Sequence, residues 1–459
     1  MIKAKIGFVK YGTHKDGLRD PSGDLFINDE IIERSIKALR DKGHEVVVND
    51  LVVAKKHEAK QIICDMATDR SIDCLVLFPG CWIWASEMIG ALREYAKTGR
   101  GIVIWTYPGS QGWRAVGGLV LKAALKEVGI KHRFVFGRAE DEEDLARIIS
   151  YCQASAVKNR INLKTMANFG GRGMGQTCGV ADASQWMKMF GIDIDTRDTT
   201  ELVKVAEAST AEEISEVYKI IEEKFVEMPE RNDITDRSIR LYIALKKICK
   251  ENDYSFYTIQ SFPGLADNYT ATCFAQSMML EDGVPTSTLS DFNTVLTSIL
   301  IMYLSEERPY YGDFQHIIKS KNEIRIVGDG AIPPSLADER GATFAKHGVP
   351  TEGSADGLSV SLVCKAGEGV VARFSRVDGK FVLVITRCTV SVPADDERQA
   401  LLQESGLPYW PHAFVTVHCD IDELLEEWDN EYACLGFGEH LYQQMIDFAE
   451  LTDIEVIKL

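Results

Sequence analysis

The 459-residue sequence lacks the features of membrane, secreted and nucleic-acid-binding proteins. No apolar run approaches the roughly 20 residues that a membrane helix needs, and the richest stretch, 294–304, is too short. The opening MIKAKIGFVKYG contains no long apolar core or cleavage site, so we expect no signal peptide. Positive charge is scarce: 51 Lys and Arg face 69 Asp and Glu. The resulting net charge of −18 argues against nucleic acid or an anionic membrane as a partner.

Cysteine pairs at metal-binding or redox spacing are also missing. The 11 cysteines are scattered, with no CxxC pair, and their odd number fits a reducing compartment. We therefore expect a cytoplasmic protein without a disulfide framework. The sequence also shows no repeat, low-complexity tract or obvious flexible linker. Its length and its apolar share of 45% predict a globular protein of roughly three domains.

Residues 3–153 alternate short apolar runs with helical patterns five times. The strand candidates are 5–12, 44–50, 73–80, 101–107 and 132–138. Such alternation predicts parallel strands joined by right-handed crossovers, and the continuous apolar runs indicate strands buried on both faces. Ligands of such sheets bind at the carboxyl ends of the strands, here 11–14, 79–84 and 107–112.

Two further regions follow. A second α/β pattern runs from about 160 to 310, with helices predicted at 183–190, 211–227, 236–251, 266–280 and 292–304. From about 311, strand-like runs predict antiparallel strands in a small β-barrel or sandwich, and the Asp-Gly step in VDGK (377–380) predicts a hairpin. The domains are predicted at 1–158, 159–308 and 309–459.

A glycine-rich loop, GGRGMG at 170–175, opens the second region. It lacks the Lys-Ser/Thr of a phosphate-binding loop, and its spacing misses the dinucleotide fingerprint. We interpret it as a tight turn that lets the backbone approach a ligand or a neighbouring subunit.

The segment Cys81-Trp82-Ile83-Trp84 follows a predicted buried strand. One tryptophan could fill the core while the other caps an interface, or the pair could form a platform on which a sugar stacks. The residues alone slightly favour the first interpretation.

Polar residues in the last two regions have ordinary structural interpretations as well. Asp291 fits the N-cap of the helix at 292–304. Asp313 fits a turn, although together with His316 it could bind a metal, and two residues do not define such a site. His412 fits a packed, hydrogen-bonded imidazole in a strand.

Taken together, these motifs resemble the fucose/arabinose isomerase family over nearly the whole chain. The resemblance rests on CWIWASE at 81–87, on GGRGMGQTCG followed by QWMKMFGIDIDTRDTTEL, on the helix after Asp291, on the Gly312-Asp313 step and on the VDGK hairpin. It implies an α/β fold in which two Rossmann-like parallel-sheet domains precede a C-terminal antiparallel β-barrel. It also implies a cyclic homo-oligomer, often a hexamer, in which a neighbour's first domain covers the active site.

The family interconverts open-chain aldoses and ketoses, usually with manganese, so the resemblance implies a small sugar as partner and Mn²⁺ or another divalent cation as cofactor. Such a cation polarises the carbonyl and bridges two substrate oxygens. A carboxylate removes the proton next to the carbonyl, and an acidic group returns it to the adjacent carbon through an enediol. Typical fucose isomerases use a Glu, an Asp and a His.

The match to these three residues is incomplete. Asp313 matches the Asp, but the Glu position falls on Leu289, and the His position falls on Glu431. Asp313 and Glu431 are therefore the predicted catalytic residues and metal ligands. The predicted substrate-binding residues are Trp82, Arg172, Gln260 and Asn430.

These two replacements leave three functions open. The first is an isomerase of a sugar or modified sugar, with no residue that selects among deoxy, sulfonated or other sugars. The second is a lyase, epimerase or dehydratase that uses a similar proton abstraction. The third is a non-catalytic sugar-binding protein.

Overall fold

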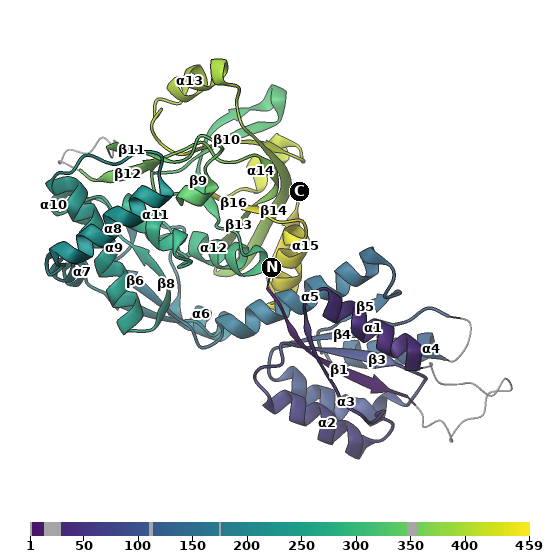
Figure 1. The fold of residues 1–459 in the computed structure, drawn as a ribbon. Coiled ribbons are helices and arrows are strands. Elements are labelled where there is room, and N and C mark those ends of the chain that lie inside the picture. The colour runs from purple at the N-terminus through teal and green to yellow at the C-terminus, as the bar shows by residue number, and fades with distance from the viewer. Residues whose placement is uncertain (1, 13–28, 110–112, 174–175, 347–355) are drawn as a thin grey trace. The chain divides into compact units, whose positions relative to one another are not determined.

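The computed structural model describes residues 2–12, 29–109, 113–173, 176–346 and 356–459. They form two compact units (Figure 1). Unit 1 comprises Met1–Arg160 and Gln443–Asp453, and unit 2 comprises Ile161–Tyr442 and Ile454–Leu459. The boundary near 308 between a second and a third domain stays a prediction. Parts of three predicted segments lie outside the described residues: 13–14, 110–112 and 174–175.

Unit 1 contains a five-stranded parallel sheet in the order β2-β1-β3-β4-β5. Its strands are β1 (Lys5–Tyr11), β2 (Glu45–Val48), β3 (Cys74–Pro79), β4 (Gly101–Thr106) and β5 (Arg133–Phe136). Every residue of β3 and β4 is buried, as the continuous apolar runs predict. The strand order reverses between β1 and β3, which is where such sheets bind ligands at their carboxyl edge.

Helices connect these strands and cover the sheet. They are α1 (Asp29–Asp41), α2 (Lys56–Thr68), α3 (Ala85–Ala96), α4 (Arg114–Glu127) and α5 (Glu142–Ile161). Apolar residues of α2, α3 and α4 share one core with the sheet, and Figure 1 shows α1 on the opposite face from α2 and α3. The predicted parallel α/β arrangement of the first region is therefore confirmed.

Unit 2 begins with a three-stranded parallel sheet in the order β7-β6-β8. Its strands are β6 (Thr165–Phe169), β7 (Asp193–Arg197) and β8 (Tyr254–Ile259). The helices of this part are α6 (Ala183–Phe190), α7 (Thr199–Glu207), α8 (Ala211–Lys224), α9 (Asp233–Glu251), α10 (Gly264–Asn268), α11 (Cys273–Glu281) and α12 (Phe292–Ser305). The prediction of a single helix at 266–280 was wrong. The N–H of Ala271 donates to the carbonyl of Asp356 at 2.8 Å, and the helix is interrupted there.

The remaining part of unit 2 is built on a seven-stranded sheet in the order β13-β16-β9-β10-β15-β14-β17, with a further pairing of β13 to β14. These strands are β9 (Tyr310–Ile318), β10 (Glu323–Val327), β13 (Gly367–Val377), β14 (Lys380–Ser391), β15 (His412–Val417), β16 (Tyr432–Phe437) and β17 (Glu455–Lys458). The hairpin prediction is confirmed, because Val377 pairs with Lys380 across Asp378 and Gly379, both at positive φ. The prediction that all strands of this region are antiparallel was wrong for one pair. Strand β17 joins β14 in parallel, so the sheet is mixed. Closure into a barrel stays a prediction.

Shorter elements complete the unit. They are β11 (Thr343–Lys346), β12 (Leu358–Ser361), α13 (Asp395–Glu404), α14 (Ile421–Glu427), α15 (Leu441–Leu451) and the 3-10 turns Lys319–Lys321 and Pro334–Leu336. Strands β11 and β12 pair as a separate two-stranded sheet, and α15 runs from unit 2 into unit 1.

Candidate functional site

Asp313 lies in β9, between neighbouring strands β10 and β16. Tyr432 is its partner in β16, and the N–H of Phe314 donates to the carbonyl of Glu431 at 2.9 Å. The approach of β10 is close, because a Cβ on Gly312 would stand 2.4 Å from the Val327 carbonyl oxygen. Strand pairing therefore places the backbone of Asp313 beside that of Glu431, which directly precedes β16.

The environment of Asp313 favours its protonated form. Burial raises its pKa to about 7, and the charges of Asp329 and Glu431 add to the shift. Among the described residues, none donates a hydrogen bond to its carboxylate. A carboxyl group that titrates near neutrality is suited to both giving and accepting a proton.

Asp329 belongs to the same cluster, and the sequence analysis missed it. It follows β10 in the Gly-Asp-Gly step at 328–330, and burial raises its pKa to about 6. Its Oδ1 is sealed from solvent and has no hydrogen-bond partner in the part of the chain that the structure describes. An acidic residue between two glycines at the end of an apolar strand was the available signal, but the segment was interpreted only as a strand.

The glycine-rich loop contacts several predicted site residues. Gln260, just after β8, accepts from the N–H of Gly171 at 2.8 Å and donates to the carbonyl of Arg172 at 3.2 Å. The Gln260 side chain therefore binds the backbone of this loop, while the side chain of Arg172 is exposed.

The end of the loop reaches the segment before β16. Gln176 donates from Nε2 to Glu431 Oε1 at 2.8 Å, and Asn430 donates from Nδ2 to the Sγ of Cys178 at 2.8 Å. Two neighbouring side chains of the predicted site, Asn430 and Glu431, are thus positioned by the described end of the loop. Gln176 and Cys178 were not identified from sequence.

Leu289, which stands where the resemblance implies a glutamate, has an unusual backbone conformation. Leu289 and Ser290 both have left-handed φ angles, of 58° and 59°, and both are buried. A left-handed residue other than glycine costs about 1–2 kcal/mol. A Cβ on Gly173 would collide with the Leu289 carbonyl oxygen at 1.9 Å, so the glycine-rich loop packs directly on this turn.

The structure confirms Asp291 as an N-cap and adds a second role. Its Oδ1 accepts from the N–H groups of Asn293 and Thr294 at 2.9 and 3.1 Å. Its Oδ2 accepts from Arg373 Nη2 at 2.8 Å, and both side chains are 2% exposed. Burial by itself lowers the pKa of Arg373, but Asp291 raises it above its usual value. Asp291 is thus part of the buried framework below the candidate site.

The structure confirms the interpretation of His412 but not a metal site at His316. His412 is buried with Nε2 3.0 Å from the Leu407 carbonyl, as a packed, hydrogen-bonded imidazole would be. A register shift in β9 places His316 opposite Arg325 and Asp313 opposite Val327, so the two share a strand face. Within the described residues, however, no three Asp, Glu, His or Cys side chains form a group that could hold a metal.

The predicted tryptophan lies in unit 1, at the carboxyl ends of β3 and β4. Trp82 is half-buried, and its ring centroid is 4.8 Å from that of Trp84 and 6.1 Å from that of Trp113. Trp84 and Trp113 are 65% and 60% exposed. Neither Trp82 nor Trp84 fills the core, so that interpretation was wrong. The other predicted site residues belong to unit 2.

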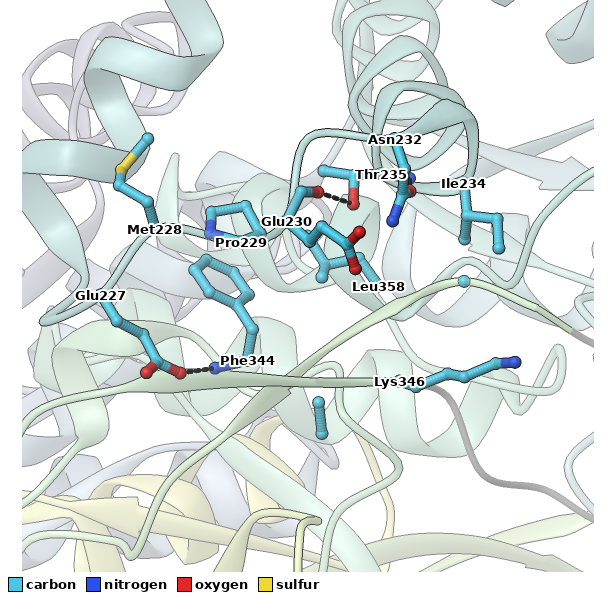
Figure 2. A pocket seen from close by; sticks show the side chains of 12 residues that line it. Glu227, Met228, Pro229, Glu230, Asn232, Ile234, Thr235, Phe344, Lys346 and Leu358 are labelled. Atoms are coloured by element: carbon cyan, nitrogen blue, oxygen red, sulfur yellow. Dashed lines mark hydrogen bonds between the residues drawn. The ribbon is translucent and has the colours of Figure 1, made fainter.

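Unit 2 has a cavity that contains none of the predicted site residues. It measures about 430 Å³ and lies between the segment after α8 and strand β11. Figure 2 shows the Glu227 carboxylate bonded to the backbone N–H of Phe344, at 3.2 Å. None of the helices in the described parts of the chain combines the length and hydrophobicity needed to cross a bilayer.

Comparison with known proteins gives related enzymes but no matching family model. The chain is 26% identical over 311 residues to a sulfoquinovose isomerase of Clostridium sp. (strain MSTE9), covering 64% of this chain and 68% of that protein. It is 24% identical over 428 residues to the sulfoquinovose isomerase of Priestia megaterium (strain ATCC 12872 / QMB1551), covering 88% and 94%.

Among solved structures, one match is a periplasmic solute-binding protein of an ABC transporter from Actinobacillus succinogenes 130z, with bound D-allose. It is 13% identical, covers 66% of this chain and 92% of that chain, and has a TM-score of 0.18, too low to support an argument. The chain is therefore similar, over most of its length, to enzymes named sulfoquinovose isomerase.

Proposed function

We propose that this protein is an aldose–ketose isomerase of a modified sugar, with sulfoquinovose as the first substrate to test. The observation that carries the proposal is that Asp313 in β9 lies beside Glu431, which directly precedes the neighbouring strand β16. The pKa of Asp313 is raised to about 7 there. Relatives named sulfoquinovose isomerase, aligned over most of the chain, support the choice of substrate.

The two carboxylates divide the proton transfers. Glu431 is exposed and held by Gln176, and it accepts the proton from the carbon next to the carbonyl. Asp313 is the more buried group and carries a proton near neutral pH, so it can protonate the carbonyl oxygen and give the enediol. Asp313 then removes the proton from the neighbouring hydroxyl while Glu431 returns its proton to the former carbonyl carbon, which restores both carboxyl groups. Enzymes usually achieve such a division by placing two carboxyl groups in environments that push their pKa values apart.

A divalent cation is part of the proposal. Asp313 and Glu431 offer the carboxylate oxygens that Mn²⁺ and Mg²⁺ prefer, and the unpartnered Oδ1 of Asp329 adds negative charge nearby. Glu431 and the ionised form of Asp313 would hold the ion, and the Lewis-acid polarisation of the carbonyl that it supplies when bound would take the place of protonation by Asp313. Leu289 contributes no ligand, so we expect weaker binding than at a site with a third protein ligand.

The decisive experiment combines activity with metal analysis. Purified protein with Mn²⁺ is incubated with sulfoquinovose and a panel of aldoses, and ketose formation is followed by NMR. Glu431→Gln and Asp313→Asn should abolish turnover, and chelation should reduce it. An absence of ketose from every aldose in the panel would refute the proposed activity.

Leu289 favours a second function. It is a buried residue with a left-handed φ angle, and it stands where the resemblance implies a glutamate. Such strain often accompanies a specialised site. A lyase, epimerase or dehydratase would give a product of changed mass or stereochemistry without ketose. Ligand-induced thermal stabilisation without any product would instead indicate a sugar-binding protein.

The resemblance also implies a cyclic homo-oligomer, which we retain as a proposal. In it, Trp82 of one subunit would contact sugar bound by a neighbour. Trp82→Ala should then raise KM more than it lowers kcat, and native mass spectrometry gives the oligomeric state. A monomer that is fully active would contradict this arrangement.

A further inference from the structure

Unit 1 contains a cavity that shares no residue with the candidate isomerase site. It measures about 450 Å³, within the usual range for small-molecule sites, and lies beside the end of α4 and the turn into β5. Three of its eight lining residues are lysines, namely Lys122, Lys126 and Lys131, and one is a glutamate. A basic cavity is unexpected in a chain with a net charge of −18.

The carboxylates near this cavity have cationic partners of their own. Arg133 binds both Asp447 and Glu450, the latter at 2.8 Å, and Asp453 pairs with Lys131 at 2.6 Å. Lys131 also donates to the Glu450 carbonyl at 2.7 Å, which fixes its side chain at the rim.

Two lysines have no such partner. Lys122 and Lys126 stand one turn apart on α4, and no carboxylate in the described residues forms an ion pair with either. The Lys122 ammonium lies 4.7 Å from the centre of the Phe134 ring, which holds it by a cation–π contact. Residues one turn apart project from the same helix face, so both charges are available to one ligand.

We propose that this cavity binds a small tetrahedral oxyanion, the phosphate or sulfonate group of a metabolite. Lys122 and Lys126 would supply charge-assisted hydrogen bonds to its oxygens. The apolar walls, Ile130 and the buried Tyr151, would contact the carbon part of the ligand. The ordinary alternative is that these lysines only complement the negative end of the α4 dipole.

The test uses inorganic phosphate and methanesulfonate as separate probes, titrated into the full-length protein at constant ionic strength. Binding is measured by calorimetry and by the shift in melting temperature. Lys122→Gln/Lys126→Gln is compared with Lys56→Gln/Lys60→Gln, an exposed pair with the same spacing on α2.

We expect saturable binding of at least one probe, weakened roughly tenfold or more by Lys122→Gln/Lys126→Gln and unchanged by the control pair. The probe that binds distinguishes a phosphorylated from a sulfonated ligand. No saturable binding up to on the order of 10 mM, or an equal loss in both double variants, would overturn the proposal.

Discussion

Unit 2 contains a buried carboxylate, Asp291, and a half-buried pair, Asp313 and Asp329, which differ in how their charge is compensated. Asp291 accepts bonds from two backbone N–H groups, Thr294 and Arg373, so every charge has a partner. Asp313 and Asp329 have no cationic partner among the described residues and repel one another. The first arrangement stabilises the fold, whereas the second costs stability and is typical of a functional site.

The largest expected effect is on catalysis at the uncompensated set. Asp313→Asn should lower kcat/KM by roughly 10²–10⁴-fold, because the amide can no longer transfer a proton. The fold should persist, since an uncompensated charge is removed. Steady-state kinetics with the aldose that yields ketose in the proposed panel provide the measurement, and the exposed Glu426→Gln is a control expected to stay near wild type. Wild-type activity in Asp313→Asn would remove this residue from the mechanism.

The compensated set should respond in stability. Asp291→Asn should reduce the free energy of unfolding by about 3–5 kcal/mol, because Arg373 is left buried without its counter-charge. Asparagine remains a good N-cap, so the loss in the free energy of unfolding reports on the ion pair and not on the cap. Asp198→Asn, at the N-cap of α7 without a buried arginine, is the matched control for denaturant unfolding. Similar small losses in both variants would mean that the ion pair contributes little.

Replacing aspartate by asparagine should have the opposite effect on the free energy of unfolding at Asp329. Its folded pKa of about 6 lies above the unfolded value near 3.9, so the folded state binds more protons between these values. Stability therefore falls as pH rises through this window. Asp329→Asn should raise stability at pH 8 by about 1–3 kcal/mol, with the gain vanishing below pH 4. Unfolding at several pH values with chelator present tests this, and destabilisation at pH 8 would show that the Asp329 carboxylate is compensated.

The smallest effect concerns the link between the glycine-rich loop and the site. Gln176→Ala removes a hydrogen bond worth about 1 kcal/mol to the exposed Glu431, so kcat should fall roughly fivefold with little change in stability. Gln185→Ala, which removes a side-chain bond to the Gly379 carbonyl, should leave kcat unchanged. Equal kinetic effects of the two variants would argue against a positioning role for Gln176.

Much of the fold followed from local patterns. The alternation of apolar runs and helices in residues 3–153 predicted the parallel sheet, because strands buried on both faces need apolar side chains throughout. The Asp-Gly step at 378–379 predicted its hairpin for an equally local reason, since both residues accept positive φ. The break between α10 and α11 could not be predicted this way, because it depends on a backbone bond from Ala271 to the distant Asp356.

The site was only partly predictable. Asp313 and Glu431 were identified by resemblance, and their neighbouring placement comes from the pairing of β9 with β16, more than 100 residues apart in sequence. Asp329 was missed because the Gly-Asp-Gly step at 328–330 was interpreted as part of a strand, and the same step also fits an ordinary turn. Its burial and its repulsion of Asp313 arise only when β9 and β10 pair.

The sequence by itself determined the acidic composition, the order of most helices and strands, and the presence of Leu289 and Glu431 where the resemblance implies a glutamate and a histidine. Only the tertiary structure decided which acids lack a counter-charge, that the glycine-rich loop holds Glu431 through Gln176, and that Leu289 lies in a left-handed turn. The physical reason is that burial and charge compensation depend on neighbours that the chain supplies from distant segments.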